Sequence, residues 1–204
     1  MRMITPAIAG LMLLLVAPAI AQTPPAGTPA RVRGTVEQLD GQILTVKTRE
    51  GPAVNITLAP DFTVATLVKA KLSDIKDGDY VASTGVKGTD GKLHAVEVRI
   101  FPPKLRGAGE GQRPWDLEPG SLMTNATVAG TAKAPDGEVL TVTYKGKTSS
   151  YIVGPDCPVL TIGTGDKSLL KPGAAVFVFA QKAPDESLTS ARLYAEKDGV
   201  KPPM

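Results

Sequence analysis

Three carboxylates surround one glycine in the first half of the chain: Asp74, Asp77 and Asp79 lie close to Gly78. Carboxylate oxygens are the ligands that calcium takes in proteins, so these aspartates are candidate metal ligands. Their spacing does not follow the ligand order of an EF-hand loop, and no glutamate stands where that loop needs a bidentate ligand. A turn that caps a short helix and leads into a strand accounts for the same residues, and we favour that interpretation.

Residues suited to nucleophilic catalysis are scarce. The chain holds one histidine, His94, and one cysteine, Cys157, which excludes a cysteine–histidine zinc site and a disulfide framework. No serine stands in a Gly-x-Ser-x-Gly setting, so a serine triad has no recognisable nucleophile. We therefore expect no catalytic residue and no cofactor. A hydrolase that uses an unrecognised pair of carboxylates is the catalytic alternative.

The single tryptophan lies in a segment rich in glycine, proline and charge, within Arg113-Pro114-Trp115-Asp116-Leu117. Trp115 and Leu117 either fasten this segment to a folded domain or join two domains to each other. In the alternative, Trp115 is a recognition anchor, because Trp and Arg are typical of interface hot spots. The candidate interface residues are therefore Arg113, Trp115, Asp116 and Leu117.

The N-terminus has the features of a secretory signal peptide. Arg2 supplies a basic start, residues 7–20 are mostly apolar, and a pattern of small residues ends at Ala21. The apolar run has about 14 residues, fewer than the roughly 20 that span a bilayer. We expect cleavage after Ala21 and a periplasmic or secreted product without a transmembrane span.

The charges of the chain are nearly balanced. Of its 204 residues, 23 are Lys or Arg and 20 are Asp or Glu, which gives a net charge of +3. This balance produces no strong field that would steer nucleic acid or an anionic membrane surface to the protein. Hydrophobic residues make up 42% of the chain, enough to build a core. We expect a folded protein that does not bind nucleic acid.

An internal repeat is the most informative pattern in the sequence. Val-Arg-Gly-Thr at 32–35 returns as Val-Ala-Gly-Thr at 128–131, an offset of 96 residues. Further on, residues 72–81 match residues 167–176 at an offset of 95. We interpret this ordered series of matches as a duplication.

Each copy of the repeat predicts β-structure. Over residues 54–58, apolar and polar side chains alternate with the period of two that places one set on a buried face. Asp-Gly at 40–41 and at 136–137 favours tight hairpin turns, because glycine accepts the positive φ that they require. Residues 69–76 predict one short helix. Several short strands and one small helix in each copy predict a small barrel, since closure removes exposed sheet edges.

The first copy resembles a family of bacterial exported proteins, domain-of-unknown-function family 5666. The resemblance lies in Gly-Thr-Val at 34–36, Leu-Thr-Val at 44–46, Leu-x-Asp-Ile-x-x-Gly-Asp-x-Val at 72–81, Gly85, and Asp-Gly-x-Leu-x-Ala at 90–95. It implies an OB-like small barrel and export, and it brings no established active-site motif. Similar exported chains are sometimes labelled metal-transport permeases, a role that conflicts with the lack of an apolar span after the signal peptide.

The second copy departs from the family pattern, because Ala174 and Glu186 stand where the first copy has Asp79 and Gly91. The fold that we expect is all-β, with two tandem OB-like barrels joined by a linker rich in glycine and proline. The expected parts are a signal peptide (1–21), a disordered leader (22–30), a first barrel (31–101), a linker with Trp115 (102–124), a second barrel (125–197) and a C-terminal tail (198–204).

These expectations favour a non-catalytic protein of the bacterial cell envelope that binds a protein, peptide or glycan partner in the periplasm. The first alternative is a metal- or small-ligand-binding accessory protein of a transport system, which would rest on the acidic loop near Gly78. The hydrolase is the second alternative.

Overall fold

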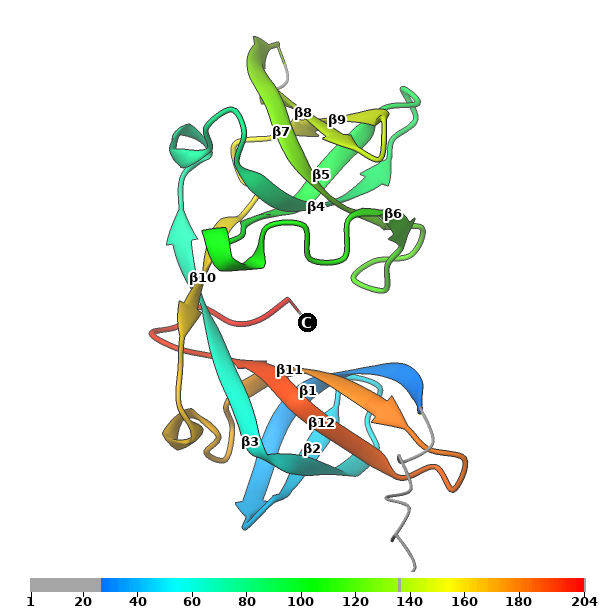
Figure 1. Cartoon of the computed structure of the whole chain (residues 1–204), viewed down its shortest axis with the longest axis vertical. Helices are drawn as coiled ribbons and strands as arrows, with labels where there is room; N and C mark the ends of the chain where they lie inside the picture. The colour runs from blue at the N-terminus through cyan, green and yellow to red at the C-terminus, as the bar shows by residue number, and fades with distance from the viewer. Residues whose placement is uncertain (1–26, 136, 204) are drawn as a thin grey trace, which may run out of the picture.

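The computed structural model of the chain describes residues 27–135 and 137–203 (Figure 1). The signal peptide predicted for residues 1–21 lies outside the described residues. The predicted all-β class is confirmed: strands and a few 3-10 turns make up the secondary structure of the described chain. None of its helical segments has the length and apolar character that a membrane crossing requires.

The strands and turns follow one another along the chain. The strands are β1 (Thr28–Asp40), β2 (Ile43–Thr48), β3 (Ala53–Ala70), β4 (Tyr80–Lys87), β5 (Leu93–Ile100), β6 (Gly111–Pro114), β7 (Leu122–Ala134), β8 (Gly137–Tyr144), β9 (Lys147–Val153), β10 (Val159–Thr164), β11 (Ala175–Lys182) and β12 (Leu188–Ala195). The 3-10 turns are η1 (Leu72–Asp74), η2 (Pro103–Leu105) and η3 (Lys167–Leu169).

Two local expectations need correction. The leader does not extend to residue 30, because Thr28, Pro29 and Ala30 already pair with β11 as the first residues of β1. The helix expected over residues 69–76 is only the single turn η1, because Lys69 and Ala70 remain in β3, where they pair with β10.

The strands close into two five-stranded rings (Figure 1). Barrel A consists of β1, β2, β3, β12 and β11 in that order, and β11 pairs back to β1. Barrel B consists of β7, β8, β9, β5 and β4, and β4 pairs back to β7. Each ring is antiparallel except for one parallel pair, β3 with β12 in barrel A and β9 with β5 in barrel B. The predicted barrel is therefore present.

The halves 31–101 and 125–197 do not each close a barrel of their own, as the sequence analysis expected. Barrel A takes β11 and β12 from the second half, and barrel B takes β4 and β5 from the first. The reason is the length of β3, whose 18 residues span about 60 Å when extended. β3 leaves barrel A and delivers the following strands to barrel B, while β10 runs back antiparallel beside it.

A pseudo-twofold axis passes through this crossing of β3 and β10. Leu67 lies opposite Ile162, and these two residues are separated by the repeat offset of 95. Ala65 pairs with Thr164, and Lys69 pairs with Leu160. The offset of 95 converts Ala65 into Leu160 and Lys69 into Thr164, so the axis maps one pair onto the other. The two copies are therefore arranged like the two subunits of a domain-swapped dimer, related by the axis at the crossing.

The register of the first strands corrects the sequence alignment. Val36 and Val128 hold equivalent positions: each precedes a β-bulge, and they pair with Val46 and Val142 respectively. The offset in this strand is therefore 92, and the match of residues 32–35 with 128–131 is four residues out of register. The longer β7–β8 hairpin accounts for the difference.

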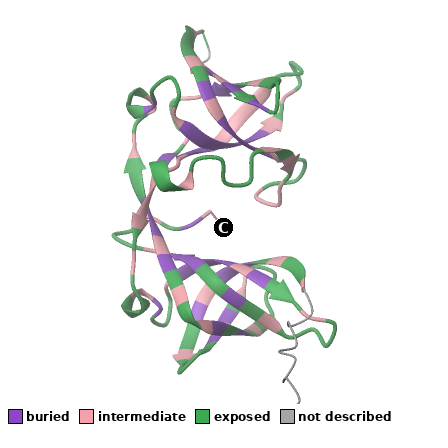
Figure 2. Cartoon of the chain, viewed as in Figure 1, coloured by how far each residue is buried: buried purple, intermediate pink, exposed green. Residues whose placement is uncertain are grey.

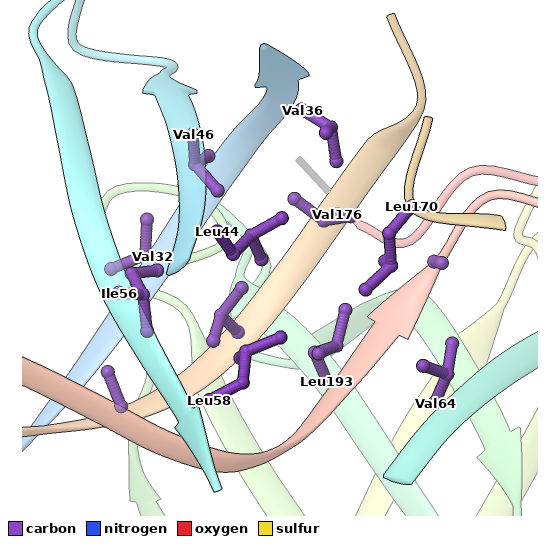
Figure 3. Close-up of a cluster of buried hydrophobic side chains, with 13 residues drawn as sticks. Val32, Val36, Leu44, Val46, Ile56, Leu58, Val64, Leu170, Val176 and Leu193 are labelled. Carbon is purple, nitrogen blue, oxygen red and sulfur yellow. The ribbon is translucent and has the colours of Figure 1, made fainter. Parts of the chain in front are cut away.

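The buried residues (Figure 2) form three hydrophobic clusters, of which Figure 3 shows the one inside barrel A. The cluster inside barrel A includes Leu44, Ile56 and Leu58 from the first half and Val176 and Leu193 from the second. A corresponding cluster fills barrel B. The third lies at the junction between the barrels, where Leu67, Leu160, Phe177 and Tyr194 are buried. We refer to this region below as the junction.

Because the halves exchange strands, cutting the linker should leave the molecule in one piece. We expect a chain with a protease recognition sequence inserted after the exposed Arg106 to keep both fragments together in size-exclusion chromatography after cleavage. Urea should then separate them, which verifies the cut. Separation of the fragments under native conditions would contradict the exchanged topology.

The crossing should also contribute measurably to stability. Leu67→Ala removes a side chain that is only 2% exposed, and we expect urea unfolding to show a loss of about 2–4 kcal/mol. Val68→Ala, in the next residue of the same strand, is the matched control because Val68 is 48% exposed. Equal effects of the two substitutions would argue against a packed crossing.

Candidate functional site: the arginine–aromatic face of the junction

The acidic loop does not assemble into a set of ligands. The carboxylate of Asp74 accepts a hydrogen bond from the Lys71 N–H, and that of Asp79 accepts one from the Lys76 N–H, both at 2.8 Å. Within residues 27–135 and 137–203, no group of three or more His, Cys, Asp or Glu side chains is placed to hold a metal ion. Asp74 and Asp79 thus cap local turns, as the favoured interpretation of Asp74, Asp77 and Asp79 proposed.

His94 and Cys157 lie in different surroundings. Nε2 of His94 lies 3.1 Å from both carboxylate oxygens of Asp90, a neighbour that the sequence analysis did not single out. Cys157 is partly buried, and burial together with the charge of Glu97 raises the pKa of its thiol to about 11. The thiol is therefore protonated at neutral pH and is a poor nucleophile.

The candidate interface residues lie in the hairpin of β6 and β7. β6 pairs with the beginning of β7, with Arg113 opposite Met123. Two hydrogen bonds close the turn between these strands. The backbone N–H of Trp115 donates to the Ser121 carbonyl at 2.8 Å, and the Ser121 hydroxyl donates to the Trp115 carbonyl at 3.0 Å. This turn fixes the position of Trp115 relative to barrel B.

The side chain of Trp115 packs on barrel A instead. Its ring meets Phe177 of β11 edge to face, with centroids 6.3 Å apart. The guanidinium carbon of Arg31 in β1 lies 4.1 Å from the centre of the indole. Trp115 therefore connects a strand attached to barrel B with the outer face of barrel A, which agrees with the expectation that it joins two domains. Leu117 lines a cavity at the junction.

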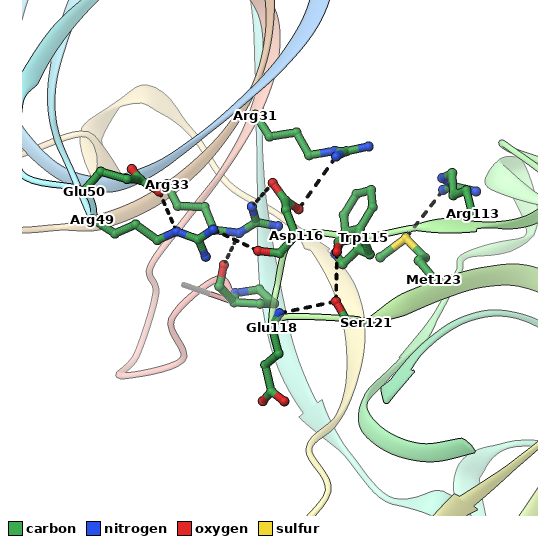
Figure 4. A network of polar contacts seen from close by, with 11 residues as sticks. Arg31, Arg33, Arg49, Glu50, Arg113, Trp115, Asp116, Glu118, Ser121 and Met123 are labelled. Carbon is green, nitrogen blue, oxygen red and sulfur yellow. Dashed lines mark hydrogen bonds and ion pairs between the residues drawn. The ribbon is translucent and has the colours of Figure 1, made fainter. Parts of the chain in front are cut away.

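Asp116 ties the linker to barrel A through arginines (Figure 4). Arg33, whose side chain is 2% exposed, donates to the Asp116 carboxylate at 2.7 Å, and Arg49 donates to the Asp116 carbonyl at 2.8 Å. Arg33 also donates to the carbonyl of Pro203 at 3.0 Å, so the C-terminal segment is held at the same place. Burial opposes ionisation of Asp116, but the hydrogen bond and charge of Arg33, with the charge of Arg31, hold its pKa below the usual value.

Barrel B contributes a buried ion pair to the junction. Arg99 donates to the Glu97 carboxylate, and both side chains are at most 5% exposed. The guanidinium of Arg99 also lies 5.1 Å from the ring centre of Tyr194 in barrel A. Arg99 and Tyr194 are equivalent under the repeat offset of 95, so this contact crosses the pseudo-twofold axis.

A row of alternating arginine and aromatic side chains crosses the outer face of barrel A and continues into the linker. Arg31, Phe179 and Arg192 are in register on β1, β11 and β12. Arg192 lies 4.5 Å from the Phe179 ring centre, and Arg31 and Arg113 lie 4.1 and 5.6 Å from that of Trp115. We refer to Arg192, Phe179, Arg31, Trp115 and Arg113 as the ladder.

The ladder carries an excess of positive charge. Within the described part of the chain, Asp116 is the only carboxylate within 4.0 Å of a ladder guanidinium, 3.8 Å from Arg31. Arg113 donates instead to the carbonyls of Gly109 and Gly111. Burial lowers the pKa of Arg113, and the charge of Arg31 acts in the same direction. Three arginines thus face one carboxylate.

Sequence reasoning found only the linker members of this site. Arg113, Trp115 and Asp116 stand out because they surround the single tryptophan. Arg31 and Arg33 of β1 and Phe179 and Arg192 of barrel A carry no signal in the sequence, because they belong to the outward-facing set of ordinary alternating strands. Only the pairing of β1, β11 and β12 brings them beside the linker.

The junction also encloses a cavity of about 570 Å³. Its walls come from β5, β10, the linker and the C-terminal segment, and they include Glu97, Leu117, Cys157, Val200 and Pro203. The walls are mainly apolar, and Glu97 is already paired with Arg99. The charged residues Lys69, Glu118 and Lys201, all exposed, also line the cavity.

Comparison with known proteins places no relative beside this geometry. No family model, no curated protein and no solved structure matches the chain.

The Arg33–Asp116 pair should make stability depend on pH. Because the folded state holds the pKa of Asp116 below its unfolded value, near 3.9, the contribution is present above that value and is lost as pH falls through the folded pKa. We expect Asp116→Asn to reduce the free energy of unfolding at pH 7 by about 1–3 kcal/mol, because it leaves Arg33 buried without its charged partner.

Urea unfolding at pH 7 and under acid conditions measures this effect, and the difference between wild type and variant should shrink in acid. Asp61→Asn, at an exposed aspartate, is the matched control and should have little effect at either pH. A deficit of Asp116→Asn that does not change with pH would show that the pair makes no such contribution.

Proposed function

We propose that the protein is a non-catalytic binding protein of the bacterial cell envelope, exported to the periplasm or secreted, and made of two OB-like barrels that exchange strands. Closed five-stranded rings with one parallel pair support the OB-like assignment. The motifs that resemble family 5666, including Leu-Thr-Val at 44–46, support it from the sequence. The basic start, the apolar run at 7–20 and Ala21 support export.

One observation carries the binding role: the ladder is present on barrel A and missing from the equivalent face of barrel B. Three of its positions lie on strands that recur in barrel B. The equivalents of Arg31, Phe179 and Arg192 there are Met123, Thr84 and Glu97, respectively.

Barrel B shows what closure of this fold requires, and its three equivalent residues are buried whereas Arg31 and Arg192 are exposed. It closes through the same order of strands and fills its interior with its own hydrophobic cluster, without a row of arginines and aromatic rings. Closing a barrel of this kind thus does not require the ladder. Arg31 and Arg192 are exposed, and Arg and Trp are the residue types enriched where proteins bind partners.

The other chemistry-bearing residues support binding over catalysis. The carboxylates of Asp74 and Asp79 cap turns, His94 pairs with Asp90 in a hairpin, and the thiol of Cys157 is protonated. Arg31 and Arg192 of the ladder, by contrast, are exposed to solvent.

Affinity capture tests this proposal. The exported form, residues 22–204, is immobilised and exposed to envelope extract of the source bacterium. We expect it to retain a partner that Arg31→Gln/Arg192→Gln does not retain, because this double variant removes two guanidinium groups from the exposed part of the ladder.

The matched control is Lys87→Gln/Lys92→Gln, which removes two exposed charges from the β4–β5 hairpin of barrel B. It should retain the same partner as wild type. Thermal unfolding of all three proteins verifies that they are folded. Equal capture by the ladder variant and wild type would contradict a binding role for the ladder.

A further inference from the structure

The first part of β1 has one side that no described strand covers. Within residues 27–135 and 137–203, Thr28–Val32 pair with β11 alone, because β2 begins to pair only at Gly34. The side to which the backbone groups point alternates along an antiparallel strand. Val36 exchanges hydrogen bonds with the residues just before β11, so the N–H and C=O of Arg31, five residues earlier, point to the uncovered side. We refer to Thr28–Val32 as the open edge.

Barrel B covers the equivalent edge with a strand of its own. The equivalent of Arg31 there is Met123 of β7, which pairs with β4 on one side and with β6 on the other. Arg113 of β6 lies opposite Met123. Met123 is buried, whereas Arg31 is exposed. β6 thus shows that this fold accepts an additional antiparallel strand at this position.

The counterpart of β6 ahead of β1 falls within the predicted signal peptide. The offset of 92 between the first strands of the two barrels carries residues 111–114 of β6 to residues 19–22. Cleavage after Ala21 would remove all of these but Gln22. The sequence that remains before β1 includes Pro24 and Pro25, which have no N–H to donate to a neighbouring strand. We therefore expect the strand that covers the open edge to come from another molecule.

The open edge is bounded at one end. The carbonyl of Arg33 accepts the Arg49 N–H at 2.9 Å, and the side chain of Arg33 is held by Asp116 and by the Pro203 carbonyl. Before this point, Arg31 offers a main-chain donor and an acceptor, and Pro29 offers a carbonyl on the same side. Main-chain hydrogen bonds of this kind supply much of the affinity when extended peptides add to a sheet.

The side chains along the open edge favour a particular pattern in the added strand. Val32 belongs to the core cluster of barrel A and Ala30 packs against it, so apolar side chains opposite these two residues would extend that core. Arg31 points to the other face. Asp116, the carboxylate nearest to it, is 3.8 Å away and is already bonded to Arg33. An acidic side chain opposite Arg31 would form a favourable cross-strand pair.

A second copy of the chain fits the open edge poorly. Because only alternate residues face the uncovered side, antiparallel pairing of two open edges places Arg31 opposite either Arg31 or Pro29 of the other copy. The first arrangement brings like charges together, which is destabilising. In the second, Pro29 has no N–H for the ladder.

From these contacts we infer that the open edge takes an extended segment of a partner protein as an additional antiparallel strand of barrel A, with an acidic side chain opposite Arg31 between two apolar ones. This inference rests on the proposed export and binding role. It names the class of partner and the way in which that partner binds.

An NMR titration of isotope-labelled residues 22–204 with the peptide acetyl-Thr-Val-Glu-Val-Thr-amide tests the inference. In the expected register, Glu lies opposite Arg31 and the two Val residues lie opposite Val32 and Ala30. We expect the amide signal of Arg31 to shift and its hydrogen exchange to slow as peptide is added. The same peptide with an N-methyl group on Glu cannot donate to the Arg31 carbonyl, and it should bind at least about tenfold more weakly.

Variants of the protein locate the binding. Arg31→Pro removes an N–H that faces away from β11, so it should keep the barrel folded and abolish binding, since proline is tolerated on strand edges. Arg31→Gln keeps the N–H and should weaken binding less than Arg31→Pro does. Lys87→Gln/Lys92→Gln, the control pair in barrel B, should bind the peptide as wild type does. Thermal unfolding verifies that each variant is folded, and the N-methylated peptide gives the same test on the unchanged protein.

Three results would overturn the inference. Equal affinity for the plain and the N-methylated peptide would show that binding does not use the main chain. An Arg31 amide that does not respond to peptide at several millimolar would show that Pro29 and Arg31 protect the edge from pairing. A dimer of residues 22–204 in which the Arg31 amide already exchanges slowly would assign the open edge to a second copy.

The inference and the proposed function can fail separately. If envelope capture depends on Arg31 and Arg192 but the peptide does not bind, strand addition is wrong and the binding role stands. If the peptide pairs with β1 but capture does not depend on these arginines, the open edge is a peptide site and the binding role of the ladder is wrong. If neither experiment gives the expected result, both are wrong.

Discussion

The antiparallel crossing of β3 and β10 is the contact on which the rest of the molecule depends. Leu67 and Ile162 meet there on the pseudo-twofold axis, and the two strands carry each half of the chain from one barrel to the other. Because both barrels borrow their closing strands, neither can complete its hydrophobic core without the other half. The crossing therefore makes one cooperative unit of a duplicated sequence, and it fixes the distance between the outer faces of the barrels.

The junction that results is symmetric in its backbone and asymmetric in its side chains. Arg99 of barrel B meets Tyr194 of barrel A, although the two positions are equivalent in the repeat. The linker adds to this asymmetry, because Trp115 and Asp116 attach to Arg31 and Arg33 on one barrel only. The two copies thus share their strand order, while a row of arginines and aromatic rings lies on the outer face of only one barrel.

The arginine side chains of the junction are positioned by packing against aromatic rings as well as by ion pairs. Arg33 is buried and paired with Asp116, so it serves the attachment of the linker. Arg31, Arg113 and Arg192 lie against aromatic rings, which restricts their side chains before any partner arrives. Restricting a long side chain in advance reduces the entropy lost on binding.

The sequence by itself determined the local structure. A period of two over residues 54–58 marks a strand, Asp-Gly at 40–41 marks a turn, and the repeat marks two equivalent units, because each of these depends on neighbouring residues only. The pairing of the closing strands was decided by tertiary structure, since β4–β5 and β11–β12 suit either barrel and only the length of β3 assigns them. The same holds for the ladder: Arg113 and Trp115 are visible around the lone tryptophan, whereas Arg31, Phe179 and Arg192 become neighbours only when β1, β11 and β12 pair across the two halves.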